Sequence, residues 1–256
     1  MTKLKATDLF DGLDKENPTP GRKPTFSPNK RLEDLLVQFK KLSETGEIGG
    51  YRNSHGRQFT IACRTLKDAA YTREEVEQFV IAAARYQDQN WFKHTFGIFT
   101  TALARASPDD SFVLHAEHYD PFHRFGAHNR KKITIYGNLG LETALDMPAG
   151  ELTIHGNVIN IGHQLRNGNI TLYGSVSSGC GEEMNNGKIS VHGSVSNAGD
   201  HMTHGMIEIH GNCQNAGPLY KSGEVHVHGD LEHINEPFNG KLYHKGTLIM
   251  KDGKKL

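Results

Sequence analysis

The sequence has little of what marks secreted, membrane-spanning or metal-clustered proteins. Its 256 residues include one tryptophan and only three cysteines, Cys63, Cys180 and Cys213. These cysteines lie far apart and form no CxxC pair, which argues against a disulfide framework and against a zinc ribbon. No apolar run reaches about 18 residues, so a transmembrane helix is not expected. The acidic opening sequence does not resemble a signal peptide, and we therefore expect a cytoplasmic protein with reduced thiols.

An excess of charge of either sign is also missing. The chain has 29 Lys and Arg residues against 29 Asp and Glu residues, so its formal net charge is zero. A protein that binds nucleic acid or an anionic membrane through its overall field would carry a surplus of positive charge. The balance of charges therefore predicts neither a nucleic-acid partner nor a membrane partner. The sequence also contains no G-x-S-x-G, no Walker loop and no G-x-G-x-x-G after a strand.

A short phrase returns at regular intervals between Lys131 and Lys245. The copies read ITIYG, LTIHG, ITLYG, ISVHG, IEIHG and VHVHG, and they close on Gly137, Gly156, Gly174, Gly193, Gly211 and Gly229. These glycines are 18 or 19 positions apart. Such a period is typical of stacked coils, because a single coil cannot bury its own apolar face.

Apolar and polar residues alternate within each copy. Ile133 and Ile135 would point inward, and Thr134 and Tyr136 outward, as in a half-buried β-strand. Aliphatic residues, most of them β-branched, fill the inward positions of the other copies as well, which suits a pleated surface. Each copy is therefore predicted to form a short strand.

A second phrase lies between the strands, most clearly in GEEMNNG (181–187) and GDHMTHG (199–205). Glycine ends each copy, where it would allow corners that strain other residues: Gly168, Gly187, Gly205 and Gly223. A bulky residue in the middle should point into the core: Met147, Leu165, Met184, Met202 and Tyr220. The predicted fold is mainly β, a right-handed parallel β-helix of about six or seven coils with an α/β N-terminal cap region.

The pattern G-x-x-M-x-x-G-x-I-x-V-x-G, which residues 181–193 follow, resembles the GXGXG domain. That domain closes the large subunit of glutamate synthase and forms much of one of the subunits of formylmethanofuran dehydrogenase. The resemblance covers about residues 131–246. It implies a right-handed β-helix that acts as a scaffold and intersubunit surface rather than as the reacting centre.

Outside the repeat, the sequence departs from glutamate synthase. The glutaminase step of that family needs an N-terminal cysteine, and position 2 here is Thr2. The clustered cysteines of its iron–sulfur chemistry and the barrel for its flavin have no counterpart in this sequence either. The resemblance therefore implies a fold and a supporting role, and it implies no catalytic residue.

Four regions follow from these patterns. Residues 1–27 are polar and contain several prolines, and we predict a disordered tail. Within it, Asp8–Leu13 (DLFDGL) is compatible with a docking motif and with a plain tail. Residues 28–130 are expected to form an α/β cap or accessory domain, 131–250 the GXGXG-like β-helix and 251–256 a basic tail. The cap would cover the unpaired edge of the first coil, and an independent ligand-binding domain is the alternative.

Within residues 28–130, the pattern predicts three helices and two strands. Apolar residues follow the helical period from Leu32 to Leu42 after a Ser27-Pro28 start. Thr72 and Glu75 form a capping box for a second helix. A third helix would carry four apolar residues on one face: Phe92, Phe96, Phe99 and Leu103. The strands are expected where Phe59, Ile61 and Cys63 alternate and at 112–117.

Histidine is the residue that could carry chemistry: sixteen are present, and fourteen lie between His115 and His244. The position before each closing glycine forms one outward column: Tyr136, His155, Tyr173, His192, His210 and His228. Because neighbouring strands lie about 4.8 Å apart, these rings should stack into a ladder. Duplicated coils also leave such ladders behind without any function. Protonation below about pH 6 would bring like charges together and make the protein acid-sensitive.

Beside this column, four side chains would form a two-by-two patch on adjacent coils: Glu208, His210, His226 and His228. Imidazole and carboxylate ligands at that spacing could hold zinc or another divalent metal. A second group lies in HAEHYDPFHRFGAH: His115, His118, His123 and His128. His115-x-Glu117 is like the H-x-E of zinc deaminases, but the required P-C-x-x-C is missing, so a deaminase is rejected. No cofactor is predicted, and a divalent metal is the open alternative.

Together these patterns favour a non-catalytic scaffold that binds another protein, or itself as a homo-oligomer, through a flat solenoid face. The alternative is a metal-dependent enzyme that uses the patch around Glu208. Paired carboxylates suited to a glycosidase are not found, because the outward strand columns contribute mainly Glu208. Cys180 is expected at a corner of the coil, where its thiol could be exposed.

Overall fold

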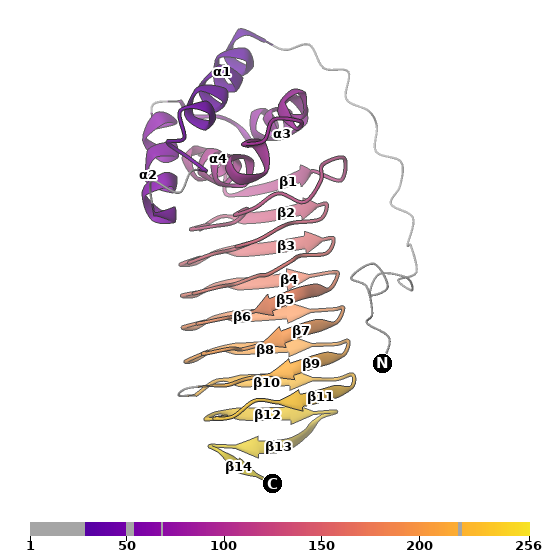
Figure 1. The fold of residues 1–256 in the computed structure, drawn as a ribbon. Helices are drawn as coiled ribbons and strands as arrows, with labels where there is room; N and C mark the ends of the chain where they lie inside the picture. Colours follow the sequence, from indigo (N-terminus) through magenta and orange to yellow (C-terminus); the bar gives the residue numbers. More distant parts are fainter. Residues whose placement is uncertain (1–28, 50–53, 68, 220–221) are drawn as a thin grey trace.

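The computed structural model describes residues 29–49, 54–67, 69–219 and 222–256 (Figure 1). Helices α1 (Lys30–Glu44), α2 (His55–Thr65), α3 (Arg73–Ala82) and α4 (Phe92–Ala106), with the 3₁₀ turn η1 (Ala83–Tyr86), gather at one end of a stack of strands. The predicted β-helix is confirmed as a mainly β solenoid of about seven turns, each about 18 residues long. The tail predicted for residues 1–27 lies outside the described residues.

A sheet of parallel strands in register forms the main face of the solenoid. Its rungs are β1 (Ser111–His115), β2 (Lys132–Tyr136), β3 (Glu151–His155), β4 (Asn169–Leu172), β6 (Lys188–Val191), β8 (Met206–Ile209), β10 (Glu224–Val227) and β12 (Lys241–His244). All six strands predicted from the repeat are present, and β1 matches the strand predicted at 112–117. Because equivalent residues of successive coils pair, each sequence position becomes a column along the solenoid axis.

A second, smaller sheet forms another face of the coils. It contains β5 (Val176–Cys180), β7 (Val195–Ala198), β9 (Cys213–Ala216) and β11 (Leu231–Ile234), again paired in parallel. In the first coils, single bridges such as Leu139 to Val158 take its place. Cys180 belongs to this sheet and is 1% exposed. The expectation of an exposed thiol at a corner is therefore wrong, because Cys180 ends a strand with its side chain in the core.

The closing glycines are needed mainly because the backbones of successive coils approach closely. A Cβ on Gly156, Gly174 or Gly211 would lie under 3.0 Å from the carbonyl oxygen of the closing glycine one coil earlier. The corner glycines have a second reason. Gly187 and Gly205 have φ of 101° and 98°, in the left-handed region that favours glycine. The sequence pattern thus reflects backbone freedom at the corners and lack of space at the strand ends.

The bulky residues between the glycines fill the core, as predicted. Met147, Leu165, Met184 and Met202 are all fully buried. The fifth member, Tyr220, lies outside the described residues. Its neighbour Leu219 is fully buried and forms a bridge with Met202. The column of buried bulky residues therefore continues into this coil at Leu219, one position before the residue predicted from the repeat.

All three helices predicted for the N-terminal region are confirmed. α1 buries the apolar residues predicted for it, and Asn29 caps it by accepting a hydrogen bond from the Leu32 amide at 2.9 Å. The predicted Ser27-Pro28 start lies outside the described residues. The capping box of Thr72 and Glu75 begins α3, and both of its reciprocal hydrogen bonds are present. α4 buries the predicted row from Phe92 to Leu103.

The strand predicted from Phe59, Ile61 and Cys63 is wrong, because this segment is helix α2. Those three residues are only partly buried. The fully buried positions are Gln58, Ala62 and Leu66, which are four residues apart and so lie on one helical face. Because this face contains one polar and one small residue, its helical period is hard to recognise in the sequence. The chance alternation of Phe59, Ile61 and Cys63 is more apparent.

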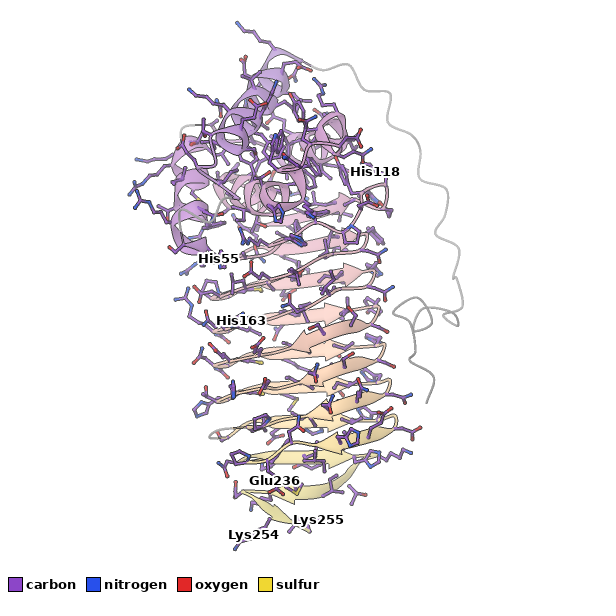
Figure 2. All side chains as sticks on the ribbon, in the orientation of Figure 1. His55, His118, His163, Glu236, Lys254 and Lys255 are labelled. Atoms are coloured by element: carbon purple, nitrogen blue, oxygen red, sulfur yellow. The ribbon has the colours of Figure 1, made fainter. Side chains whose placement is uncertain are left out.

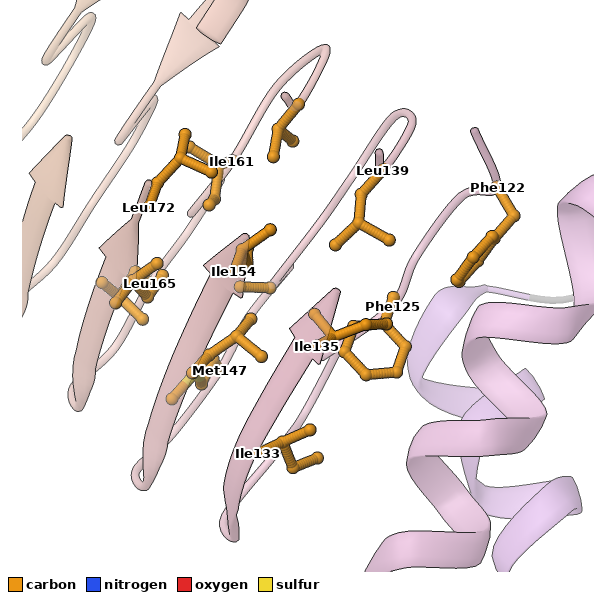
Figure 3. Packing of buried hydrophobic residues seen from close by; sticks show 14 of the residues in the cluster. Phe122, Phe125, Ile133, Ile135, Leu139, Met147, Ile154, Ile161, Leu165 and Leu172 are labelled. Atoms are coloured by element: carbon orange, nitrogen blue, oxygen red, sulfur yellow. The ribbon is translucent and has the colours of Figure 1, made fainter. Parts of the chain in front are cut away.

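The helices and the solenoid share one continuous core. The ring of Phe96 in α4 lies 4.8 Å from that of Phe122, which contacts the coils, and Phe122 bridges to Leu139 of the next coil. Figure 3 shows Phe122 and Phe125 between the helices and the inward residues of β2. The helices therefore cover the first coil, as predicted for a cap, and their core is continuous with that of the coils.

The far end of the solenoid is closed by β13 (Thr247–Lys251) and β14 (Lys254–Lys255), which pair antiparallel. Residues predicted as a basic tail thus form the last strand of the main sheet. Lysines on an edge strand disfavour pairing with another chain. Among the described residues, no helix is both long and apolar enough to cross a membrane.

Candidate functional site

The outward column of aromatic and imidazole rings is the most regular surface feature of the molecule. Successive centroids lie 4.5 Å apart from Tyr136 to His155, 4.7 Å to Tyr173, 4.4 Å to His192, 4.8 Å to His210 and 5.0 Å to His228. The planes differ by at most 20°. The predicted column is therefore a continuous stack, which we call the ring ladder.

The ladder has one more member than the sequence predicted. The ring of His115, in β1, lies 5.0 Å from that of Tyr136 with an interplanar angle of 5°. His115 pairs with Tyr136 in the register of the main sheet. The sequence contains the signal, since FVLHA (112–116) is a copy of the repeat in which Ala116 replaces the closing glycine. With His115 included, the ring ladder spans seven coils.

Burial within the stack shifts the ionisation of some ladder histidines. Burial lowers the pKa of His155. It also lowers the pKa of His192, and the neighbouring His210 lowers that pKa further. Tyr173 in the middle of the stack remains 49% exposed. The ladder is thus a half-exposed surface in which two histidines, His155 and His192, have a lowered pKa and favour the neutral form.

The proposed metal ligands are only partly brought together. Nε2 of His228 lies 3.4 Å from Oε1 of Glu208, whose Oε2 lies 2.9 Å from Nζ of Lys188. The hydrogen bond from Lys188 is the main reason that the pKa of Glu208 is lowered. His210 stacks on His228. Glu208 is therefore held as a carboxylate between a lysine and a histidine.

His226, the fourth member of the patch, is engaged elsewhere. Its Nε2 lies 3.2 Å from Oε2 of Glu224, and its ring stacks on Tyr243 at 4.3 Å. Glu224 also contacts Nζ of Lys241 at 2.7 Å, and this hydrogen bond is the main cause of its lowered pKa. No three His, Cys, Asp or Glu side chains in the described part of the chain are placed to hold one metal ion.

The second histidine group does not form one cluster. His115 joins the ladder and contacts Glu117 at 3.2 Å, whereas His118 packs against the ring of Tyr119. His123 accepts a hydrogen bond from the Leu141 amide through Nδ1. Burial, with His94 and two cations nearby, lowers the pKa of His123 to about 4. His128 lies 3.2 Å from Asp146. The structure thus gives these four histidines separate environments.

Ion pairs along one corner of the first coils were not predicted. Glu142 contacts Nε2 of His55 in α2 at 3.5 Å and Nε of Arg124 at 2.6 Å. Four residues later in the same coil, Asp146 lies between His128 of the preceding coil and Arg166 of the following one. Figure 2 shows His55 and His163 on this side of the molecule, away from His118. Because His55 and Glu142 are far apart in the sequence, no local pattern could have paired them.

Comparison of the chain with protein-family models, with curated proteins and with solved structures gave no significant match.

Proposed function

We propose that this protein is a non-catalytic scaffold that binds a partner protein through the outer face of its main sheet, as part of a larger complex. The observation that carries the proposal is the unbroken ring ladder from His115 to His228. The resemblance of the repeat to the GXGXG domain, a scaffold in its own family, supports the same role.

The ladder has the physical properties of a preorganised binding surface. Each ring packs face to face against its neighbours, so its orientation is already fixed before a partner arrives. A fixed surface loses less side-chain entropy on binding than a mobile one. Tyrosine is also enriched at protein interfaces, where it adds apolar area and a polar group. The half-exposed Tyr173, at the centre of the ladder, is the natural contact point.

The alternative is a metal-dependent enzyme at the patch around Glu208, and the approach of His228 to Glu208 is the observation in its favour. Against it, Glu208 is paired with Lys188, and His226 contacts Glu224 instead of the patch. Elemental analysis of the purified protein separates the two proposals. Stoichiometric zinc that is lost in His210→Ala/His228→Ala would overturn the scaffold. We expect no stoichiometric metal in either protein.

The scaffold proposal is tested by the mass of the native assembly. Full-length protein purified gently from its own cells is expected to run as a complex, in which mass spectrometry identifies the partner. Tyr173→Arg places a charge in the middle of the ladder and is expected to weaken the complex at least tenfold. Gln214→Arg, an exposed position in β9 on the other sheet, is the matched control. A stable monomer from native cells, or equal loss in both variants, would refute the proposal.

A further inference from the structure

A groove lies on the helical cap, away from the ring ladder. It has a volume of about 400 Å³ and is lined by residues of α2, by Lys67 and by the C-terminal end of α4. Partly buried Phe59, Cys63 and Ala106 give it an apolar lining, and exposed Arg64 and Arg105 add positive charge together with Lys67. A volume of this size falls within the range of small-ligand and side-chain pockets, about 300–1,000 Å³.

The edge of the groove is positively charged. Three other arginines of the cap are paired with carboxylates: Arg31 with Glu75, Arg73 with Asp109 and Arg85 with Glu33. Within the described residues, no carboxylate lies within ion-pair distance of Arg64, Lys67 or Arg105, and no acidic side chain lines the groove. Arg64, Lys67 and Arg105, which have no ion-pair partner among the described residues, give the apolar lining a positive local potential in a chain with no net charge. This combination fits a ligand with carboxylates beside large apolar groups.

The chain itself contains a segment with that chemistry. Asp8–Leu13 has the sequence DLFDGL, in which two carboxylates alternate with Leu9, Phe10 and Leu13. The segment precedes α1, and the fifteen residues between Leu13 and Asn29 can span roughly 50 Å when extended. Helices α2 and α4 contain 11 and 15 residues and are about 16 and 22 Å long. The tether is therefore long enough to reach the groove from the start of α1.

We propose that the groove between α2 and α4 is the docking site for Asp8–Leu13 of the same chain. Phe10 would enter the apolar part beside Phe59 and Cys63, and Asp8 and Asp11 would pair with the cations at its edge. Tethering raises the effective concentration of the segment to the millimolar range, so even a weak contact would be occupied. The inference concerns the cap and does not depend on the function proposed for the ladder.

Disulfide trapping in the full-length protein tests this directly, because Cys63 lines the groove while Cys180 and Cys213 are buried. Phe10→Cys is oxidised with copper phenanthroline, and peptide mapping measures its disulfide with Cys63. Thr19→Cys, in the same tail but outside the segment, is the control. We expect the Phe10→Cys protein to cross-link at least tenfold faster within one chain. Equal rates would overturn the proposal, and so would a predominantly interchain disulfide, which would assign the groove to a second copy.

Charge exchange provides a second readout. Arg64→Glu is expected to reduce cross-linking of the Phe10→Cys protein to the control rate, and Asp8→Arg/Asp11→Arg in the same chain is expected to restore it. In the otherwise unaltered protein, Asp8→Arg/Asp11→Arg should release the groove and increase the rate of Cys63 alkylation several-fold. An unchanged alkylation rate would show that the segment does not cover Cys63 and would leave the groove to an external acidic peptide.

Discussion

Lack of space, and not only backbone conformation, explains why glycine is needed at some positions of this protein. Gly97 lies in the middle of α4, where glycine has no conformational advantage. A Cβ at this position would lie less than 3.0 Å from the backbone of His123 and Phe125. The glycine is needed because α4 packs directly against the segment that leads into the coils.

Replacement of this glycine should therefore destabilise the protein despite the higher helix propensity of alanine. For Gly97→Ala we expect a loss of about 1–3 kcal/mol, because backbone atoms must move. Gly56→Ala, near the start of α2, is the control, since its nearest neighbour atoms lie 3.8 Å away. That variant should be neutral or slightly more stable. Thermal unfolding measures both, and a neutral Gly97→Ala would show that α4 is loosely packed.

The capping box at the start of α3 leads to a second prediction for a single residue. The Thr72 hydroxyl accepts a hydrogen bond from the Glu75 amide at 3.3 Å, and the Glu75 carboxylate accepts one from the Thr72 amide at 2.9 Å. Thr72→Ala should cost about 1 kcal/mol, whereas Thr72→Ser keeps the acceptor and should cost little. Urea unfolding distinguishes them. Equal stability of the two variants would contradict a role for the hydroxyl.

At the scale of elements, the ring ladder links the stability of the solenoid to pH. Burial lowers the pKa of His155 and of His192 below the usual value of 6.5. The unfolded chain therefore binds protons first as pH falls. The stabilising contribution of these histidines is complete above pH 6.5 and is lost as pH falls from 6.5 through their lowered pKa values. Glu208 and Glu224 have pKa values below 4.5 and stay ionised in this range.

We accordingly expect the melting temperature to fall between pH 7.5 and pH 5.5. For a chain of this size, each kcal/mol corresponds to roughly 2–4 °C. His123, whose pKa is lowered to about 4, contributes to the same fall from within the cap. His155→Gln/His192→Gln removes only the ladder contribution and should make the melting temperature less dependent on pH. A melting temperature that does not change with pH would refute the link.

The helices of the cap show how far local sequence determines an element. α1, α3 and α4 could be predicted because large apolar residues repeat at the helical period and, in α3, because a capping box marks the start. α2 could not be predicted, because its buried face consists of Gln58, Ala62 and Leu66. Gln58 is polar, but it is buried because it accepts a hydrogen bond from the Gly49 amide. Its place in the core depends on a contact that only the folded chain provides.

At the scale of the whole molecule, cap and solenoid are expected to unfold together. Phe96 packs on Phe39 within the helices and on Phe122, which extends the core into the coils. Phe96→Ala should cost about 3–5 kcal/mol. Because the core is continuous, hydrogen exchange should accelerate in β1 and β2 as well as in the helices. A melt with two transitions, or faster exchange confined to the helices, would contradict a single cooperative unit.

The solenoid could be predicted from the sequence, because every coil repeats the same local pattern of residues. Each copy carries the alternation of a half-buried strand and the glycines that coil stacking needs, so strands, core column and ladder all follow from position within the copy. Features that depend on contacts between distant segments became visible in the folded chain alone, and the folded chain accounts for three of them. It turned His226 toward Glu224, buried Cys180 and brought α2 against Glu142. Those outcomes depend on rotamers and packing partners, which a periodic sequence does not encode.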